Sequence, residues 1–486
     1  MARKRKELPE ILNVEITGIA AEGKALTKIK LKETDETPIV VFVPYAAPGD
    51  IVNIKIDKKK HSFAEAHLTG LINPSPLRVE PKCQYFGICG GCKWQHLPYE
   101  EQLKFKRQQV VDALTRIGKV ELPEIPSTLG SDNIWYYRNK MEYTFSNKRW
   151  KSWEEIRGEK VGSNQSEALG FHIPGSYDKV LHINECHLQN NIGNKIRNFI
   201  YQYAIDNDLS FYDIKGNQGL LRTLMIRPLE SGELMVCLTF GEKESEKSNL
   251  LMKDLLKEFP SITTLVYVIN QKLNDSIADQ EINIFHGRGY IEEKMGSLKY
   301  RISAKSFYQT NSRQAERLYK TTAEFAGLSN DLENEKRPLV YDLYTGTGTI
   351  ANYIARKASK VIGIEYVEDA IKDAKINSEI NGIKNTEFYS GDMKNVLTSE
   401  FISQHGKPDV IIVDPPRAGM HEDVVNVIKN AGPQTIVYVS CNPATQARDL
   451  SLMDSKYKVT RVQPVDMFPH THHVENVVKL EKRRMD

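Results

Sequence analysis

The chain of 486 residues carries a formal net charge of +3, and 40% of its residues are hydrophobic and 27% charged. These values are typical of a globular protein and exclude a disordered or fibrous chain. Because single hydrophobic cores stop growing at about 250–300 residues, we expect two or three domains. The sequence has no apolar run long enough to span a bilayer and no apolar stretch behind its basic start (residues 1–6). We therefore expect no membrane contact and a cytoplasmic location.

Residues 1–71 contain several short runs of apolar and β-branched residues, separated by glycine, proline and charged turns. Short strands at this spacing predict a small OB-like β-barrel, a fold that commonly binds nucleic acid. Because the net charge is close to zero, nucleic-acid contacts would have to come from local basic patches.

Residues 72–304 begin with a proline-rich segment that follows the predicted barrel. A cysteine cluster and an amphipathic helix near residues 99–118 come next. Strand and helix patterns then alternate irregularly, which predicts a mixed α+β central domain. Within this domain, residues 147–167 are polar and charged, so we expect an exposed loop there.

Residues 305–486 show a regular alternation of near-continuous apolar strands and helices. This pattern predicts a doubly wound α/β domain, whose mostly parallel sheet is covered by helices on both faces. The last two strands are expected to form a closing hairpin. In such domains the ligand binds at the carboxyl ends of the strands.

Polar residues follow the first four strands of this domain. Gly346 and Gly348 form a turn after the first strand, which lets the backbone approach a ligand closely. Glu365 ends the second strand about twenty residues later, where an acid can bind both hydroxyls of a ribose. The turn lacks the third glycine of a dinucleotide fingerprint, which favours a nucleoside cofactor over NAD. Asp392 and Asp414 complete this row at the ends of the third and fourth strands.

The six cysteines indicate metal binding or catalysis rather than disulfides in a chain of this kind. Cys441 lies in the turn Ser-Cys-Asn-Pro that follows the apolar strand TIVYV, where a doubly wound sheet opens to its ligand. Cys237 lies inside the apolar strand LMVCLTF and is expected to be structural. Glu475 adjoins the closing hairpin on the same side of the sheet, so it is the best candidate for a base beside Cys441.

Three histidines (His470, His472 and His473) precede Glu475 and invite a metal-site interpretation. No second ligand cluster accompanies them in this domain. We therefore expect solvated or hydrogen-bonding histidines rather than metal ligands.

The segments DLYTGTGTI, VDPPRAG, VYVSCNP and MFPHTHHVENV together closely resemble the RNA uridine-C5 methyltransferases. The resemblance implies a class I fold that uses S-adenosylmethionine as methyl donor. It assigns Cys441 as nucleophile, Glu475 as the proton-abstracting base and Asp414 as a contact to the uracil. The implied cofactor-binding residues are Gln309, Tyr344, Gly346, Thr349, Glu365, Asp392 and Asp414. The implied RNA contacts are Phe307, which would stack on a flipped base, and Arg138 and Lys140.

The proposed chemistry explains why such a site contains a thiol. Uracil C5 is too weakly nucleophilic to take a methyl group directly, and a thiolate added to C6 converts the ring to an enolate whose C5 can attack. The proton on C5 must then leave before the thiol is eliminated, which requires a base.

Cys83, Cys89, Cys92 and Cys186 offer four thiolates, and their spacing alone permits either zinc or an iron–sulfur cluster. The family resemblance implies a [4Fe-4S] cluster on these cysteines, with zinc as the alternative. The branch that methylates 23S ribosomal RNA combines such a cluster with an N-terminal TRAM domain, so 23S rRNA is the expected substrate and no obligate protein partner is inferred. The alternatives are a tRNA uridine-C5 methyltransferase and a non-catalytic RNA-binding ribosome-assembly factor.

Overall fold

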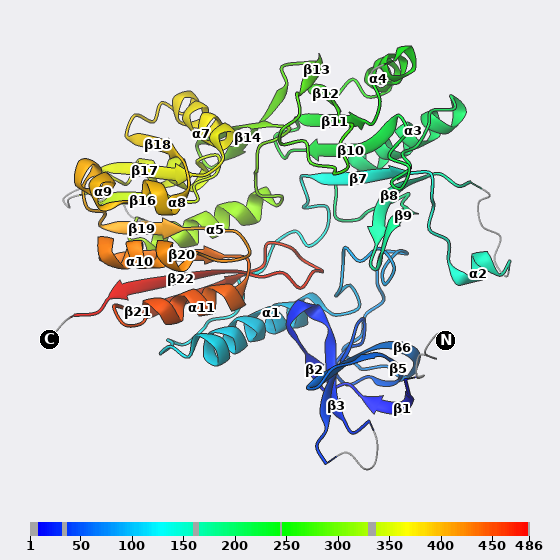
Figure 1. The fold of residues 1–486 in the computed structure, drawn as a ribbon, viewed down its shortest axis with the longest axis horizontal. Coiled ribbons are helices and arrows are strands. Elements are labelled where there is room, and N and C mark those ends of the chain that lie inside the picture. The colour runs from blue at the N-terminus through cyan, green and yellow to red at the C-terminus, as the bar shows by residue number, and fades with distance from the viewer. Residues whose placement is uncertain (1–7, 32–35, 159–164, 244, 329–336, 485–486) are drawn as a thin grey trace, which may run out of the picture.

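The computed structural model describes residues 8–31, 36–158, 165–243, 245–328 and 337–484, whose strands form three large sheets and a separate hairpin (Figure 1). The basic start of the chain, residues 1–6, lies outside these ranges. Within them, no helix is long and apolar enough to cross a membrane.

The N-terminal sheet has the strand order β1-β5-β6-β4-β3-β2 and is antiparallel except for the β4–β6 pair. Its core is small and aliphatic, with Val41, Ile54 and Ala64 fully buried. These short β-branched strands confirm the predicted N-terminal β module. The elements are β1 (Glu10–Glu15), β2 (Gly18–Ile19), the 3-10 turn η1 (Ala21–Gly23), β3 (Ala25–Ile29), β4 (Ile39–Val43), β5 (Ile51–Lys59) and β6 (Phe63–Asn73).

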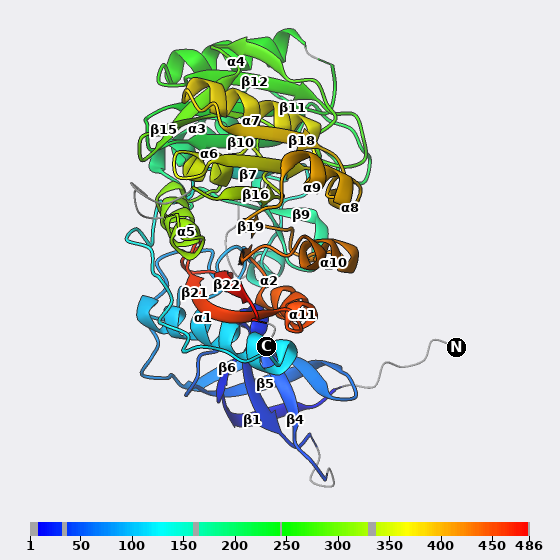
Figure 2. The ribbon, with the colours of Figure 1, turned by 90° about the vertical axis from the view of Figure 1, so that its left-hand side faces the viewer.

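The segment after the barrel carries helix α1 (Tyr99–Ala113), which continues into a π-helical turn, η2 (Leu114–Gly118). Val110 and Leu114 are fully buried in the core of the C-terminal domain, where α1 and η2 contact helix α11 (Pro443–Met453). Figure 2 shows α1 beside α11, above the barrel. The helix therefore packs with the C-terminal domain, although it lies in the range 72–304 of the predicted central domain. The boundaries at 71/72 and 304/305 stay predictions.

The central sheet has the order β13-β12-β11-β10-β7-β8-β9, with one parallel pair, β11–β12. Cys237 is buried in β11, which confirms its predicted structural role. The polar segment 147–167 contains a short helix begun by a capping box on Ser152, and its residues 159–164 lie outside the described ranges. The strands are β7 (Met141–Ser146), β8 (Ala168–Ile173), β9 (Ser176–His182), β10 (Leu221–Pro228), β11 (Leu234–Phe240), β12 (Thr264–Ile269) and β13 (Asn283–His286). The helices are α2 (Trp153–Ile156), α3 (Asn191–Asp206) and α4 (Glu246–Glu258), and the hairpin is β14 (Tyr290–Met295) with β15 (Leu298–Ser303).

The C-terminal sheet has the order β18-β17-β16-β19-β20-β22-β21. Its first five strands are parallel, whereas β22 is antiparallel to both β20 and β21 and lies between them. This arrangement confirms the doubly wound fold and the closing hairpin. The strands are β16 (Leu339–Leu343), β17 (Lys360–Glu365), β18 (Thr386–Ser390), β19 (Val410–Val413), β20 (Thr435–Ser440), β21 (Tyr457–Val465) and β22 (Glu475–Lys482). The helices besides α11 are α5 (Ser312–Phe325), α6 (Thr349–Ala355), α7 (Glu368–Ile380), α8 (Met393–Val396), α9 (Ser399–His405) and α10 (Glu422–Ala431).

Both faces of this sheet are buried. Residues of α5, α6 and α7 cover one face, in a core that also includes the β14–β15 hairpin and parts of β10 and β11. Residues of α8, α10, α11 and α1 cover the other face. Because helices fill both faces, the carboxyl edge of the parallel strands is the place left for ligands.

Candidate active site

The turn after β16 has an unusual backbone, since Tyr344, Gly346 and Gly348 have φ values of 63°, 56° and 72°. A Cβ on Gly348 would come within 2.9 Å of the Ala374 Cβ, so glycine allows the turn to pack closely on α7. The Gly346 N–H donates to Glu365 Oε2 over 3.2 Å. The structure thus brings together the predicted glycine turn and the predicted ribose-binding acid.

A small cavity of about 250 Å³ lies at the carboxyl ends of these strands. Tyr344, Tyr366 and Asp392 are among the residues that line it. Asp392 Oδ1 also accepts the Lys394 N–H (3.2 Å) and so caps α8. Aromatic rings beside a carboxylate suit a nucleoside, since the rings can stack on a base while the acid binds hydroxyl or amino groups.

Cys441 and Glu475 lie at the end of the β20–β22 ladder, one residue beyond its last pair. Ser440 pairs with Asn476 in this antiparallel ladder, so the next step places Cys441 opposite Glu475. Directly opposed residues have Cβ atoms about 4.5–5.5 Å apart on the same face of a sheet. Glu475 is only 6% exposed and Cys441 is half-buried. The thiol and the predicted base therefore face each other in a largely dry site.

The acids around the thiol hold their protons unusually tightly. Burial raises the pKa of Glu475 to about 8, with a further contribution from Asp414, while Arg417 opposes the shift. Burial and the nearby Asp342 raise the pKa of Asp414 to about 7. Both carboxyl groups can therefore exchange protons near neutral pH, as acid–base catalysis requires.

The Cys441 thiol does not ionise readily in this site, because its surroundings raise its pKa. Burial, followed by the negative charges of Glu475 and Asp414, raises the pKa of Cys441 to about 11, whereas the positive charge of Arg417 and a hydrogen bond from its side chain lower it. The Arg417 carbonyl accepts hydrogen bonds from Asn442 Nδ2 (3.0 Å) and Thr445 Oγ1 (3.1 Å), which tie the loop after β19 to the cysteine turn. Arg417 is therefore the positive charge that would stabilise a thiolate at Cys441.

Arg417 is a site residue that the sequence-based assignment missed. Its position directly after Asp-Pro-Pro at the end of β19 is the signal that could have pointed to it. The sequence could not show that its side chain turns back to the cysteine of the next strand.

A larger cavity of about 780 Å³ opens beside this group, bordered by Arg417 and His473. The predicted RNA contacts Phe307, Arg138 and Lys140 also line it. Phe307 is 69% exposed, and its carbonyl accepts the Thr347 hydroxyl of the glycine turn (3.3 Å). An exposed ring next to basic side chains suits a stacked nucleotide base.

Of the predicted cofactor-binding residues, Tyr344 and Asp392 line the smaller cavity, whereas neither cavity is bordered by Gln309, Gly346, Thr349, Glu365 or Asp414. Gln309 is 9% exposed, and its carbonyl accepts Asn139 Nδ2 (3.0 Å). Thr349 begins α6, and its hydroxyl accepts the Tyr319 hydroxyl (3.3 Å). The predicted cofactor contacts of all these residues stay predictions.

All four predicted metal-binding cysteines (Cys83, Cys89, Cys92 and Cys186) line the far side of the larger cavity. Burial raises the pKa of Cys89 to about 11 and that of Cys92 to about 12, and the neighbouring thiols add to both shifts. The structure therefore brings the four thiols together: Cys83, Cys89 and Cys92 lie before α1, and Cys186 lies between β9 and α3. Among the described residues, no three His, Cys, Asp or Glu side chains are arranged to hold a single metal ion.

Comparison with known proteins gives consistent matches along the whole chain. A family model described as tRNA (Uracil-5-)-methyltransferase matches residues 231–483, and a TRAM domain model matches residues 5–69. An uncharacterized RNA methyltransferase of Bacteroides thetaiotaomicron is 56% identical over 468 residues, which is 96% of this chain and 100% of that protein. A second, of Chlorobaculum tepidum, is 40% identical over 478 residues, covering 97% and 96%.

Among solved structures, the fold is similar to that of the Pyrococcus abyssi tRNA (uracil-54, C5)-methyltransferase in complex with S-adenosyl-L-homocysteine. The TM-score is 0.72 at 28% sequence identity, and the match covers 96% of this chain and 100% of that one. The similarity thus includes the barrel, the central domain and the C-terminal domain.

Proposed function

Because the chain belongs to the tRNA (uracil-5-)-methyltransferase family, we propose that it methylates C5 of a uridine in RNA through a covalent Cys441 adduct. It is an S-adenosylmethionine-dependent RNA methyltransferase with an N-terminal TRAM domain. The observation that carries the covalent proposal is that Cys441 and Glu475 both adjoin the last pair of the β20–β22 ladder, Ser440 with Asn476, and interact electrostatically beside Arg417. Methyltransferases that act on amino groups need neither this thiol nor this base.

In the proposed reaction Arg417 stabilises the Cys441 thiolate, which adds to C6 of the uracil. The electron pair of the C5–C6 double bond moves to the C4 carbonyl oxygen, which gives an enolate, and the return of this pair lets C5 form a bond to the methyl carbon. S-adenosylmethionine supplies that group from its sulfonium and leaves as S-adenosylhomocysteine. Glu365, Asp392 and Tyr344 would hold the donor at the ends of β16, β17 and β18.

Glu475 completes the proposed reaction by accepting the proton from C5. The electron pair of the C5–H bond restores the C5–C6 double bond and expels the Cys441 thiolate. Asp414 lies close enough to Glu475 to raise its pKa, and it would contact the polar edge of the uracil. A buried base of raised pKa is well matched to a weakly acidic carbon-bound proton.

We further propose 23S rRNA as the substrate and the cytoplasm as the location, with tRNA as the alternative. The rRNA assignment rests on the four-cysteine motif together with the TRAM domain, and the tRNA alternative on the tRNA substrate of the Pyrococcus abyssi enzyme. Mapping of 5-methyluridine in total RNA, with and without this protein, tests both assignments. Loss of a 5-methyluridine from 23S rRNA alone supports the first, and loss from tRNA alone overturns it.

The release step should depend on pH. Because Glu475 must be ionised to accept the C5 proton and its pKa is raised to about 8, release should accelerate about tenfold per pH unit up to about pH 8 and then level off. Single-turnover measurements of adduct breakdown between pH 6 and pH 9 test this expectation. The Glu475→Gln variant should lose the dependence, and a flat wild-type profile would contradict the assignment of Glu475.

We also propose that Cys83, Cys89, Cys92 and Cys186 hold a [4Fe-4S] cluster. Burial, followed by the neighbouring thiols, raises the pKa of Cys83, Cys89 and Cys92, so these thiols stay protonated without a metal, whereas bound metal cations would favour the deprotonated form of all four. The cluster would join the segment before α1 to the central domain and so shape one wall of the larger cavity.

Protein purified without air should contain about four iron and four sulfide per chain, because each of the four thiolates can ligate one iron. Cys89→Ser should lose most of the iron and bind RNA more weakly, while its affinity for S-adenosylmethionine stays within about twofold of wild type. Elemental analysis and calorimetry measure these quantities. Cys237→Ala, which removes a thiol outside the cavity, is the matched control and should retain its iron. Stoichiometric zinc without iron would overturn the cluster.

A further inference from the structure

The loop between β21 and β22 (residues 466–474) forms a wall of the larger cavity, to which it contributes Phe468, Thr471 and His473. Val465 and Glu475 are cross-strand partners at the end of the hairpin, so the loop begins and ends at this pair. Contacts that hold this loop in place therefore also position the end of the hairpin, where the proposed base Glu475 lies.

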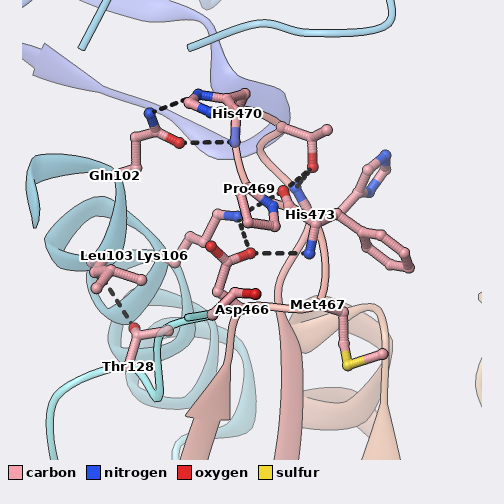
Figure 3. A network of polar contacts seen from close by, with 12 residues as sticks. Gln102, Leu103, Lys106, Thr128, Asp466, Met467, Pro469, His470 and His473 are labelled. Atoms are coloured by element: carbon pink, nitrogen blue, oxygen red, sulfur yellow. Dashed lines mark hydrogen bonds and ion pairs between the residues drawn. The ribbon is translucent and has the colours of Figure 1, made fainter. Parts of the chain in front are cut away.

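A buried ion pair holds the first residue of this loop. Lys106 Nζ on α1 lies 2.5 Å from Asp466 Oδ1, and both side chains are 0% exposed (Figure 3). Lys106 also donates to the Phe468 carbonyl (3.1 Å), while Asp466 accepts the Phe468 N–H (2.9 Å) and the Tyr99 hydroxyl (2.8 Å). Such a pair is costly to bury, and it is tolerated here because hydrogen bonds satisfy both partners.

His470 is held in the middle of the loop from several sides. Its ring stacks on Trp135 with centroids 3.7 Å apart. Its backbone N–H donates to Gln102 Oε1 over 2.8 Å (Figure 3). Its carbonyl accepts the N–H groups of both Lys93 (2.9 Å) and Trp94 (3.0 Å). The φ of His470 is +65°, a conformation that residues other than glycine keep only where their surroundings impose it.

The same contacts reach the barrel. Trp94 is fully buried, and its Nε1–H donates to the Gly23 carbonyl in η1 (3.1 Å). A Cβ on Gly23 would come within 2.7 Å of the His472 Cβ, so the barrel turn lies directly against the loop. A continuous set of contacts therefore joins the barrel, α1 and the loop that precedes Glu475.

We propose that α1 and the barrel turn act as a clamp on this loop, with Lys106, Asp466 and His470 as positioning residues for the base Glu475. None of the three is assigned a step in the reaction. Apolar pairs of similar size often replace buried ion pairs without loss of stability. The polar pair at this position therefore contributes mainly a defined loop geometry, through its bonds to Phe468. The inference rests on the proposed covalent function.

The test replaces the ion pair by an apolar pair in the full chain, as Lys106→Met with Asp466→Leu. The thermal midpoint should stay within a few degrees of wild type, and the affinity for S-adenosylmethionine within about twofold, because the donor site lies at other strand ends. Turnover should fall at least about tenfold, with accumulation of the methylated protein–RNA adduct, since proton removal by a displaced Glu475 is slowed. Lys104→Met, which breaks an exposed pair on the same helix, should change none of these values.

Two reference variants make the outcome unambiguous. If Glu475→Gln traps an adduct while the folded double variant turns over normally or traps none, the clamp is overturned. If Glu475→Gln also traps none, the assignment of Glu475 as the base fails, and the clamp fails with it. Tyr99→Phe removes the hydrogen bond to Asp466 Oδ2, together with the bond that the Tyr99 hydroxyl accepts from the Ser131 N–H (2.7 Å), and serves if the double variant does not fold. The Tyr99→Phe variant should slow adduct breakdown about threefold without a change in its affinity for S-adenosylmethionine. A rate of adduct breakdown equal to that of the wild type would overturn the clamp.

Discussion

Replacement of Cys441 by alanine should lower methyl transfer to RNA by at least about 10⁴-fold, because the thiol forms the bond that activates C5. The affinity for S-adenosylmethionine should change by less than about threefold, which is under about 1 kcal/mol. The two effects separate because the glycine turn, Glu365 and Asp392 lie at the ends of β16, β17 and β18, whereas Cys441 follows β20. Transfer of a labelled methyl group and calorimetric titration with the donor measure the two quantities.

RNA containing 5-fluorouridine tests the same bond directly. Wild-type protein should form a stable adduct with it, since fluorine cannot leave C5 as a proton does, and Cys441→Ala should form none. Cys237→Ala is the matched control, because this thiol is buried in β11 away from the site, and its loss should cost about 1 kcal/mol of stability without changing turnover per folded molecule. Substantial turnover by Cys441→Ala would exclude the covalent mechanism.

The sequence predicted the row of polar residues at the strand ends because parallel strands in a doubly wound sheet all point the same way. Gly346, Glu365 and Asp392 could therefore be assigned to one edge from chain order alone. The hairpin at the end of the chain was also predictable from its pattern. The position of β22 between β20 and β21 was not predictable, because the local sequence pattern does not reveal that β22 rather than β21 pairs with β20. That pairing is what sets Cys441 opposite Glu475.

Long-range contacts account for the other differences between prediction and structure. A lysine in an amphipathic helix is expected to face solvent, yet Lys106 is fully buried against Asp466, 360 residues further along the chain. Arg417 was likewise visible in the sequence, but its hydrogen bond to Cys441 depends on how two loops meet. Helical spacing identified α1 without showing that it packs on the C-terminal domain, because that depends on the partner surface.

Replacement of Glu475 by glutamine should trap the methylated RNA on the protein. The amide matches the carboxyl group in size but cannot accept the C5 proton, whereas thiol addition and methyl transfer come before that step. Addition should not be slowed, because the negative charge of Glu475 raises the pKa of Cys441 and the amide removes that charge. Turnover should fall by on the order of 10²–10⁴-fold. A denaturing gel and mass spectrometry of the adduct measure the outcome.

The trapped species must carry both the methyl group and the bond to Cys441 to support this order of steps. Glu481→Gln is the matched control, since Glu481 lies on the same strand in an ion pair with Lys479 and should be replaceable without trapping RNA. An unmethylated adduct would mean that Glu475 acts before methyl transfer. Normal turnover, or no adduct with ordinary RNA, would assign proton removal to another group, and His473 on the wall of the same cavity would be the next residue to replace.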